Sequence, residues 1–367
     1  MALDDPDLPR EKSGPLRDDS VLLHTEGHAG YITLNRPRAI NALTHPMVRA
    51  VHAALDAWEI DEAINVVVIA GAGERGLCAG GDIRAIHDDA RGGGRASVDF
   101  WRDEYRLNAR IARCTKPYVA LMDGIVMGGG VGVSAHGSVR VVTERSAVAM
   151  PETGIGFVPD VGGTHLLARA PGELGTHLAL TGEAVGAGDA LLLSLADHFV
   201  PSDRLADLTA SLATVDAAEA VRRHEAAAPE AELAAHRHWI DHCYAADSAE
   251  EIVERLSSCG ETAAKEAAET ILMRSPTAVK VTLAAIRRAR ALGELEAVLE
   301  QEFRVSCAAL SSHDLVEGIR AQVVDKDRSP RWSPAALADV ADSEVARHFA
   351  PFEDREPGAA RGLSLEG

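Results

Sequence analysis

Two acidic side chains, Glu152 and Asp160, are the residues of this chain best suited to chemistry. They lie in the segment MPETGIGFVPDVGG, which is otherwise apolar or rich in glycine and proline. If this segment is buried, desolvation raises the pKa of both carboxyl groups, which suits acid–base or nucleophilic catalysis. Asp160 could instead cap a helix that begins near Gly162. Glu152 has no comparably simple structural role.

Two glycine clusters could supply the electrophilic half of such a site. The sequence CAGGD at 78–82 follows one short apolar run, and MGGG at 127–130 follows a second. Glycine lets the backbone approach a ligand closely, and two N–H groups that face one carbonyl oxygen form an oxyanion hole. Taken alone, each cluster is equally well explained as a tight turn.

Other motifs fail in their context. GAGERG at 71–76 matches GxGxxG, but the residues after it do not open a helix, which argues against a dinucleotide site. Ser134 lies in GVSAH, which lacks the final glycine of a nucleophile elbow, so we expect it to pack within a helix. The sequence contains no HExxH or Walker pattern, and we therefore expect no metal and no separate cofactor.

Hydrophobic periodicity predicts the elements that must position these residues. Short apolar runs favour strands buried on both faces, and apolar residues at helical spacing favour amphipathic helices. In chain order we expect a hairpin of residues 21–24 and 31–34, a helix after Thr44, a strand at 64–70, a helix at 100–113 and a strand at 117–122. This alternation of strands and helices predicts βα units stacked side by side.

The composition changes near residue 201, where Ala, Glu, Leu and Arg begin to recur at helical spacing. Residues 217–269 are especially rich in Ala and Glu, and we interpret them as surface helices that form a cap or arm. The resulting division is a disordered lead-in at 1–19, a core at 20–200, a helical C-terminal region at 201–334, and a tail at 335–367 that is largely disordered at its end.

Charge and composition exclude several classes of protein. The net charge of −19, with no run of four basic residues, argues against nucleic-acid binding. The apolar runs are too short to cross a bilayer, which argues against a membrane partner. Five scattered cysteines form no CxxC pair, and the acidic N-terminal segment lacks an apolar core, so we expect a cytoplasmic protein.

Four motifs together resemble a known superfamily. CAGGD, MDGIVMGGGVGVSAHG, AMPETGIGFVPDVGG and LALTG, in this order, are similar to the crotonase (enoyl-CoA hydratase/isomerase) superfamily, and the similarity extends from about residue 21 to residue 332. With FWRDEYRLN at 100–108, the chain most resembles the branch that hydrolyses 3-hydroxyacyl-CoA thioesters. The resemblance implies an α/β fold with a crotonase-like β-β-α spiral core and a helical C-terminal region. It also implies an acyl-CoA substrate, so that CoA is part of the substrate.

The resemblance further implies roles for particular residues. It assigns the oxyanion hole to the N–H groups of Gly81 and Gly129, and catalytic or substrate-binding roles to Glu104, Glu152 and Asp160. It places CoA along one turn and one loop, made of Arg38, Ala39, Asn41, Ala42 and Leu43, and of Ala79, Gly80, Asp82 and Ile83. The residues do not decide whether Glu152 acts as nucleophile or as general base.

One departure from the superfamily pattern favours hydrolysis. Hydratases usually carry a second catalytic glutamate three residues after the oxyanion glycine, where this chain has Gly132, and they usually carry glycine where it has Asp160. We therefore expect hydrolysis, and the reaction that the resemblance implies is the hydrolysis of 3-hydroxyisobutyryl-CoA to 3-hydroxyisobutyrate and CoA, a step of valine breakdown. Hydration or isomerisation of an enoyl-CoA, a non-catalytic binding role on the same fold, and a homo-oligomer stay open.

Overall fold

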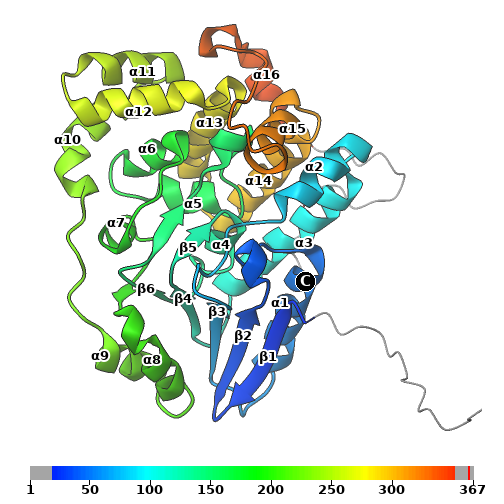
Figure 1. Ribbon diagram of the computed structural model, residues 1–367, viewed down its shortest axis with the longest axis vertical. Helices are drawn as coiled ribbons and strands as arrows, with labels where there is room; N and C mark the ends of the chain where they lie inside the picture. The colour runs from blue at the N-terminus through cyan, green and yellow to red at the C-terminus, as the bar shows by residue number, and fades with distance from the viewer. Residues whose placement is uncertain (1–18, 352–362, 364–367) are drawn as a thin grey trace, which may run out of the picture.

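A six-stranded sheet forms the centre of the fold in the computed structural model, which describes residues 19–351 and 363 (Figure 1). Its strand order is β1-β2-β3-β4-β6-β8, with β1 and β2 antiparallel and the other pairs parallel. A second sheet pairs β5 with β7. The strands are β1 Val21–Glu26, β2 Ala29–Leu34, β3 Val66–Gly71, β4 Tyr118–Met122, β5 Ile125–Met127, β6 Val139–Val142, β7 Ala147–Ala149 and β8 His198–Phe199.

The alternation of side chains along each strand gives the sheet two buried faces. Ile32 and Ile69 point to one face, where they belong to the same apolar cluster as helices α1 (His45–Glu59) and α3 (Arg95–Ala112). Tyr31 and Val68 point to the other face, which is covered by helices α8 (Leu205–Leu212) and α9 (Ala217–His224). Burial on both faces explains why β3 and β4 are almost continuously apolar.

Three segments meet beyond the ends of the strands. The chain leaves β3 through a loop into α2 (Ile83–Gly92), leaves β5 into α4 (Gly129–Gly132), and leaves β7 into the short helix η2 (Glu152–Ile155) and then α5 (Gly163–Ala168). Backbone hydrogen bonds join these segments, because Met127 donates to Cys78 at 3.0 Å and Gly128 donates to Ala149 at 3.3 Å. Residues far apart in the sequence are thereby held in one place.

The region after residue 200 is helical, as expected, and residues 202–320 form no strand. It packs against the core and does not project as an arm, because small alanine side chains let helices approach closely. Ala217, Ala220 and Val221 of α9 are buried on the sheet, and α12 likewise buries Ala264 and Ala268. The helices are α10 Leu233–Tyr244, α11 Ala249–Ser258, α12 Thr262–Met273, α13 Pro276–Leu292, α14 Leu295–Ala309, α15 His313–Ile319 and α16 Asp342–Arg347.

The predicted strands and helices are confirmed with small shifts of their ends. Helix α3 begins five residues before the predicted start, because Gly93 and Gly94, with φ of 117° and 78°, end α2 and let a new helix begin at once. The predicted lead-in and the end of the predicted tail lie mostly outside the described residues, and the domain boundaries stay predictions. In the described part of the chain, no helix is both long and apolar enough to cross a membrane.

Candidate active site

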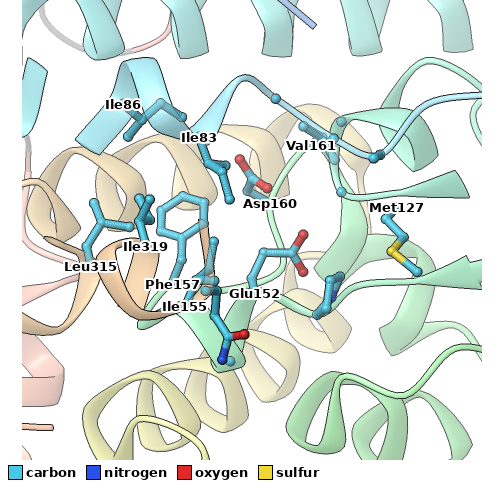
Figure 2. A pocket seen from close by; sticks show the side chains of 18 of the residues that line it. Ile83, Ile86, Met127, Glu152, Ile155, Phe157, Asp160, Val161, Leu315 and Ile319 are labelled. Atoms are coloured by element: carbon cyan, nitrogen blue, oxygen red, sulfur yellow. The ribbon is translucent and has the colours of Figure 1, made fainter. Parts of the chain in front are cut away.

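A cavity of about 290 Å³ lies where the three segments meet. Figure 2 shows the carboxyl groups of Glu152 and Asp160 in this cavity, with Ile83 and Phe157 among the apolar side chains around them. The predicted residues that line it are Ala79, Gly80, Gly81, Ile83, Glu104, Gly129, Glu152 and Asp160. The structure therefore brings the glycine loops and the acidic residues together in one place.

The amides of Gly81 and Gly129 lie side by side at this cavity. A Cβ atom built on Gly129 would be 3.3 Å from the Gly81 nitrogen, and among the described residues neither amide donates to a backbone acceptor. Gly129 is the first residue of α4, where the N–H groups have no partner within the helix. Two neighbouring amides without a backbone acceptor are suited to bind the oxygen of a thioester carbonyl.

Two carboxyl groups lie close to the backbone of Gly128 and Gly129. A Cβ atom on Gly129 would lie 2.7 Å from Glu104 Oε1, and one on Gly128 would lie 2.9 Å from Glu152 Oε1. Gly128 also has φ of 50° and ψ of −119°, a conformation that residues with side chains rarely adopt. The glycines are therefore needed both for the backbone path and for the space that the carboxyl groups and the substrate must share.

The three acidic side chains of the cavity are almost fully buried. Glu104, Glu152 and Asp160 are 2%, 6% and 5% exposed, and Glu104 Oε1 and Glu152 Oε2 have no hydrogen-bond partner within the described residues. Burial raises the pKa of Glu104 and of Glu152 well above the ordinary value, and the charge of Asp160 raises both pKa values further. The three groups cannot all be ionised at neutral pH, so the site holds exchangeable protons.

Asp160 differs from the two glutamates because it has a strong hydrogen-bond donor. The Tyr105 hydroxyl donates to Asp160 Oδ2 at 2.6 Å and lies 2.7 Å from Ser306 Oγ. Burial raises the pKa of Asp160 to about 7, and the Tyr105 hydrogen bond limits this rise. Burial also raises the pKa of Tyr105 well above its ordinary value, so the tyrosine keeps its proton and stays a donor.

Asp160 does not cap the following helix, contrary to the simpler interpretation of its sequence. The N-cap residue of α5 is Gly162, which has no side chain that could accept a hydrogen bond from the helix. The amides of Gly162 and Thr164, at the start of this helix, donate instead to the carboxyl group of Glu302, at 2.6 and 2.9 Å. The Asp160 side chain is thus left for the cavity.

The predicted CoA turn lies outside the cavity. The Asn41 side chain is fully buried and holds the turn together, because it accepts from the Arg36 amide and donates to the carbonyls of Ala72 and Gly76. Leu43 and Asp82 line a neighbouring cavity of about 150 Å³. Arg38 and Ala39 are exposed, and Ala42 is half-buried. Their contact with CoA stays a prediction.

Several residues of the site were missed in the sequence analysis. Tyr105 could have been found, because it follows Glu104 on a helix whose inward positions recur every three or four residues. Ser306 and Glu302 come from α14, nearly 150 positions after Asp160, and nothing near them in the sequence marks them. The same holds for the residues that the C-terminal region adds to the cavity wall, which are Arg274, Leu315, Ile319 and Gln322.

Gly132 leaves no room for a second glutamate. A Cβ atom at this position would lie 2.7 Å from Val161 Cβ and 2.8 Å from Asn108 Nδ2, distances that require the neighbours to move. The space in which hydratases of the superfamily place a catalytic side chain is therefore filled by α3 and by the residue after Asp160.

Comparison with known proteins confirms the resemblance. A profile of the enoyl-CoA hydratase/isomerase family matches residues 29–349. The mitochondrial 3-hydroxyisobutyryl-CoA hydrolase of Gallus gallus is 42% identical over 92% of this chain and 90% of its own length, and that of Danio rerio is 43% identical over 92% and 91%. A crystal structure described as a carnitinyl-CoA dehydratase from Mycobacterium thermoresistibile is 51% identical, with a TM-score of 0.91 over 95% of this chain and 100% of that one.

The names of the relatives contradict the prediction of a cytoplasmic protein, since those hydrolases are described as mitochondrial. The prediction rested on the scattered cysteines and on the composition of the N-terminal segment. The structure shows no disulfide among its described residues. The absence of disulfides does not distinguish one cellular compartment from another.

The comparisons agree on a crotonase-type fold, and the cavity of this fold is lined by the two glycine loops and by buried carboxyl groups. The profile covers most of the chain, and the two hydrolases match it over nearly their full length. The chain therefore belongs to the enoyl-CoA hydratase/isomerase family, and its relatives there include 3-hydroxyisobutyryl-CoA hydrolases.

Proposed function

We propose that this enzyme hydrolyses a short-chain 3-hydroxyacyl-CoA thioester, with 3-hydroxyisobutyryl-CoA as its substrate. The observation that carries the proposal is the meeting of two free amides, at Gly81 and Gly129, with the buried Glu152 and Asp160 in one cavity. The names of the relatives support the same reaction. We further propose that the reaction serves valine breakdown, in which hydrolysis releases the hydroxy acid from CoA.

The two amides bind the thioester oxygen and stabilise the negative charge that forms on it when the carbonyl is attacked. An amide that donates to such an oxyanion contributes about 3–4 kcal/mol to lowering the barrier. Apolar side chains such as Ile83 and Phe157 line the cavity, and they limit the water that can compete for these donors.

Glu152 and Asp160 share the proton that the reaction requires. Burial and mutual repulsion prevent the double ionisation of the pair, and Asp160 has its pKa near neutrality. In the resting site the proton lies mainly on Glu152, because the Tyr105 hydrogen bond favours ionised Asp160 and Glu152 Oε2 has no partner among the described residues. The reactive form is the minor tautomer, in which Asp160 holds the proton and Glu152 is ionised. Glu152 then attacks the acyl carbon or takes a proton from water, the C–S bond breaks, and Asp160 supplies the proton that the CoA sulfur gains.

The two routes differ in whether Glu152 becomes covalently attached to the acyl group. Nucleophilic attack forms a mixed anhydride that water then hydrolyses, whereas general-base catalysis delivers water directly to the acyl carbon. A single turnover in water labelled with oxygen-18 separates them. Label in the Glu152 carboxyl group supports the anhydride, and its absence there excludes that route.

Hydration and dehydration form a second candidate, because the solved structure at 51% identity is described as a carnitinyl-CoA dehydratase. Such a reaction commonly uses a second acid or base opposite Glu152. The crowding around Gly132 opposes it here, since Val161 and Asn108 fill the space for that side chain.

An assay of CoA release tests the proposal. The panel contains 3-hydroxyisobutyryl-, 3-hydroxypropionyl-, acetyl- and crotonyl-CoA, with enoyl absorbance followed for the last, and includes Glu152→Gln and Asp160→Asn enzymes. We expect fast thiol release from the 3-hydroxyacyl substrates and its reduction to a low residual rate in both variants, because the oxyanion hole and substrate binding remain. Loss of crotonyl-CoA absorbance without thiol release would establish hydration and overturn the proposed function.

A further inference from the structure

Helix α14 contacts the Asp160 segment through Glu302, which has no part in the mechanism above. Glu302 is 1% exposed. Its carboxyl group accepts from the Gly162 amide at 2.6 Å, from the Thr164 amide at 2.9 Å and from the Thr164 hydroxyl at 2.5 Å. All three donors belong to the turn that directly follows Asp160.

This turn has an unfavourable backbone conformation. Val161 has φ of 54°, and Gly162 has φ of 79°. A β-branched residue such as valine is an outlier in the left-handed region, so the surroundings must hold it there. Two contacts do so, because the Val161 carbonyl lies 2.8 Å from His136 Nε2 and the next amide donates to Glu302.

The chemistry of Glu302 fits this purpose. A buried carboxyl group is costly unless hydrogen bonds compensate for its desolvation. Both oxygens of the Glu302 carboxyl group act as acceptors, and their hydrogen bonds to Thr164 and Gly162 limit the rise of its pKa, which burial brings to about 8. An apolar side chain at this position would leave the amides of Gly162 and Thr164 buried without an acceptor.

We propose that Glu302 is a positioning residue that fixes the turn after Asp160 and so keeps the Asp160 carboxyl group in the cavity. This inference rests on the role of Asp160 in the proposed function. Ser306, one helical turn further along α14, acts from the other side, because it contacts the Tyr105 hydroxyl that donates to Asp160. In this way the helical C-terminal region completes the site that the core begins.

A double-mutant cycle tests the inference, with Glu302→Gln, Asp160→Asn and the double variant. A misplaced catalytic group can lower the rate roughly a hundredfold, so we expect Glu302→Gln to lower kcat by roughly tenfold to a hundredfold and to change KM by less than about twofold. When Asp160 is already replaced, Glu302→Gln should lower kcat by less than about twofold more, because residues that act through one another are not additive. If Glu302→Gln lowers kcat by the same factor whether or not Asp160 has been replaced, the two effects are independent and the inference is wrong.

Glu300→Gln is the matched control, because this partly exposed glutamate of the same helix pairs with Arg304. It should leave kcat unchanged. If Glu302→Gln does not fold, Thr164→Val removes a single donor to the carboxyl group and Thr164→Ser retains it. We expect the valine variant to lower kcat and the serine variant to restore it, and equal activity of the two would also overturn the inference.

The cycle is measured with whichever acyl-CoA the wild-type enzyme converts. Hydration without thiol release would therefore refute the proposed function and still leave the coupling between Glu302 and Asp160 measurable. If the enzyme hydrolyses the thioester but the effects of the two substitutions on kcat simply multiply, the coupling is refuted and the proposed function is left intact.

Discussion

Replacing Asp160 with asparagine should stabilise the folded protein, and more so at high pH. The carboxyl group is 5% exposed, and burial raises its pKa from 3.8 to about 7. Below about pH 3.8 the Asp160 carboxyl group is protonated in both the folded and the unfolded state, so it does not reduce the stability of the folded protein. The cost grows as the pH rises, because the unfolded chain ionises first, and it becomes constant above about pH 7.

The magnitude follows from the two pKa values. Each pH unit between them costs about 1.36 kcal/mol, so the full cost is about 4 kcal/mol, and about 1–2 kcal/mol of it is present at about pH 5. Asparagine is uncharged and can still accept from Tyr105, which limits the loss of that hydrogen bond. The variant should therefore gain about 2–3 kcal/mol more stability at about pH 8 than at about pH 5.

Urea unfolding followed by circular dichroism at the two pH values measures this difference. The control is Glu62→Gln, which removes an acid from an exposed position. Its effect should be within about 0.5 kcal/mol at both pH values. An Asp160→Asn stabilisation that is equal at both pH values, or that decreases as the pH rises, would refute the reasoning that burial raises this pKa.

Three further predictions concern the residues around the Asp160 carboxyl group and the two glycine loops. Tyr105→Phe removes the hydrogen bond that favours ionised Asp160, so the pKa of Asp160 should rise. The alkaline fall of kcat/KM should therefore move to higher pH. An unchanged pH profile would contradict the role of Tyr105. Gly129→Ala places a methyl group where Glu104 Oε1 lies 2.7 Å away, and steady-state assays should show kcat reduced roughly a hundredfold or more, whereas near-normal turnover would place the oxyanion elsewhere. Gly132→Ala crowds Val161 and Asn108 and should cost about 1–3 kcal/mol in urea unfolding, and a neutral result would show that this space is open to a second catalytic side chain.

The local signals in the sequence predicted most elements of the core. The apolar runs at 64–70 and 117–122 became β3 and β4 because strands buried on both faces need apolar side chains throughout. The glycine clusters predicted close backbone approach, and the structure places both at one cavity. The segment that contains Glu152 and Asp160 stood out because acids are rare in apolar surroundings, and both side chains are buried. The Ala/Glu-rich stretch showed that helices would form, but not that they would pack against the core.

Residue types, apolar runs and the order of the motifs were enough to predict the acids and glycines of the site, the strands that end beside it and the family resemblance. The partners of each carboxyl group depend on how distant parts of the chain pack together. Asp160 differs from Glu152 because the Tyr105 hydroxyl of α3 donates to it. From α14, Ser306 contacts that hydroxyl, and Glu302 accepts from the Gly162 amide in the turn after Asp160. These contacts join positions that are far apart in the chain. Hydrogen bonding and desolvation depend on what lies within a few ångströms in space, so local sequence patterns could not reveal them.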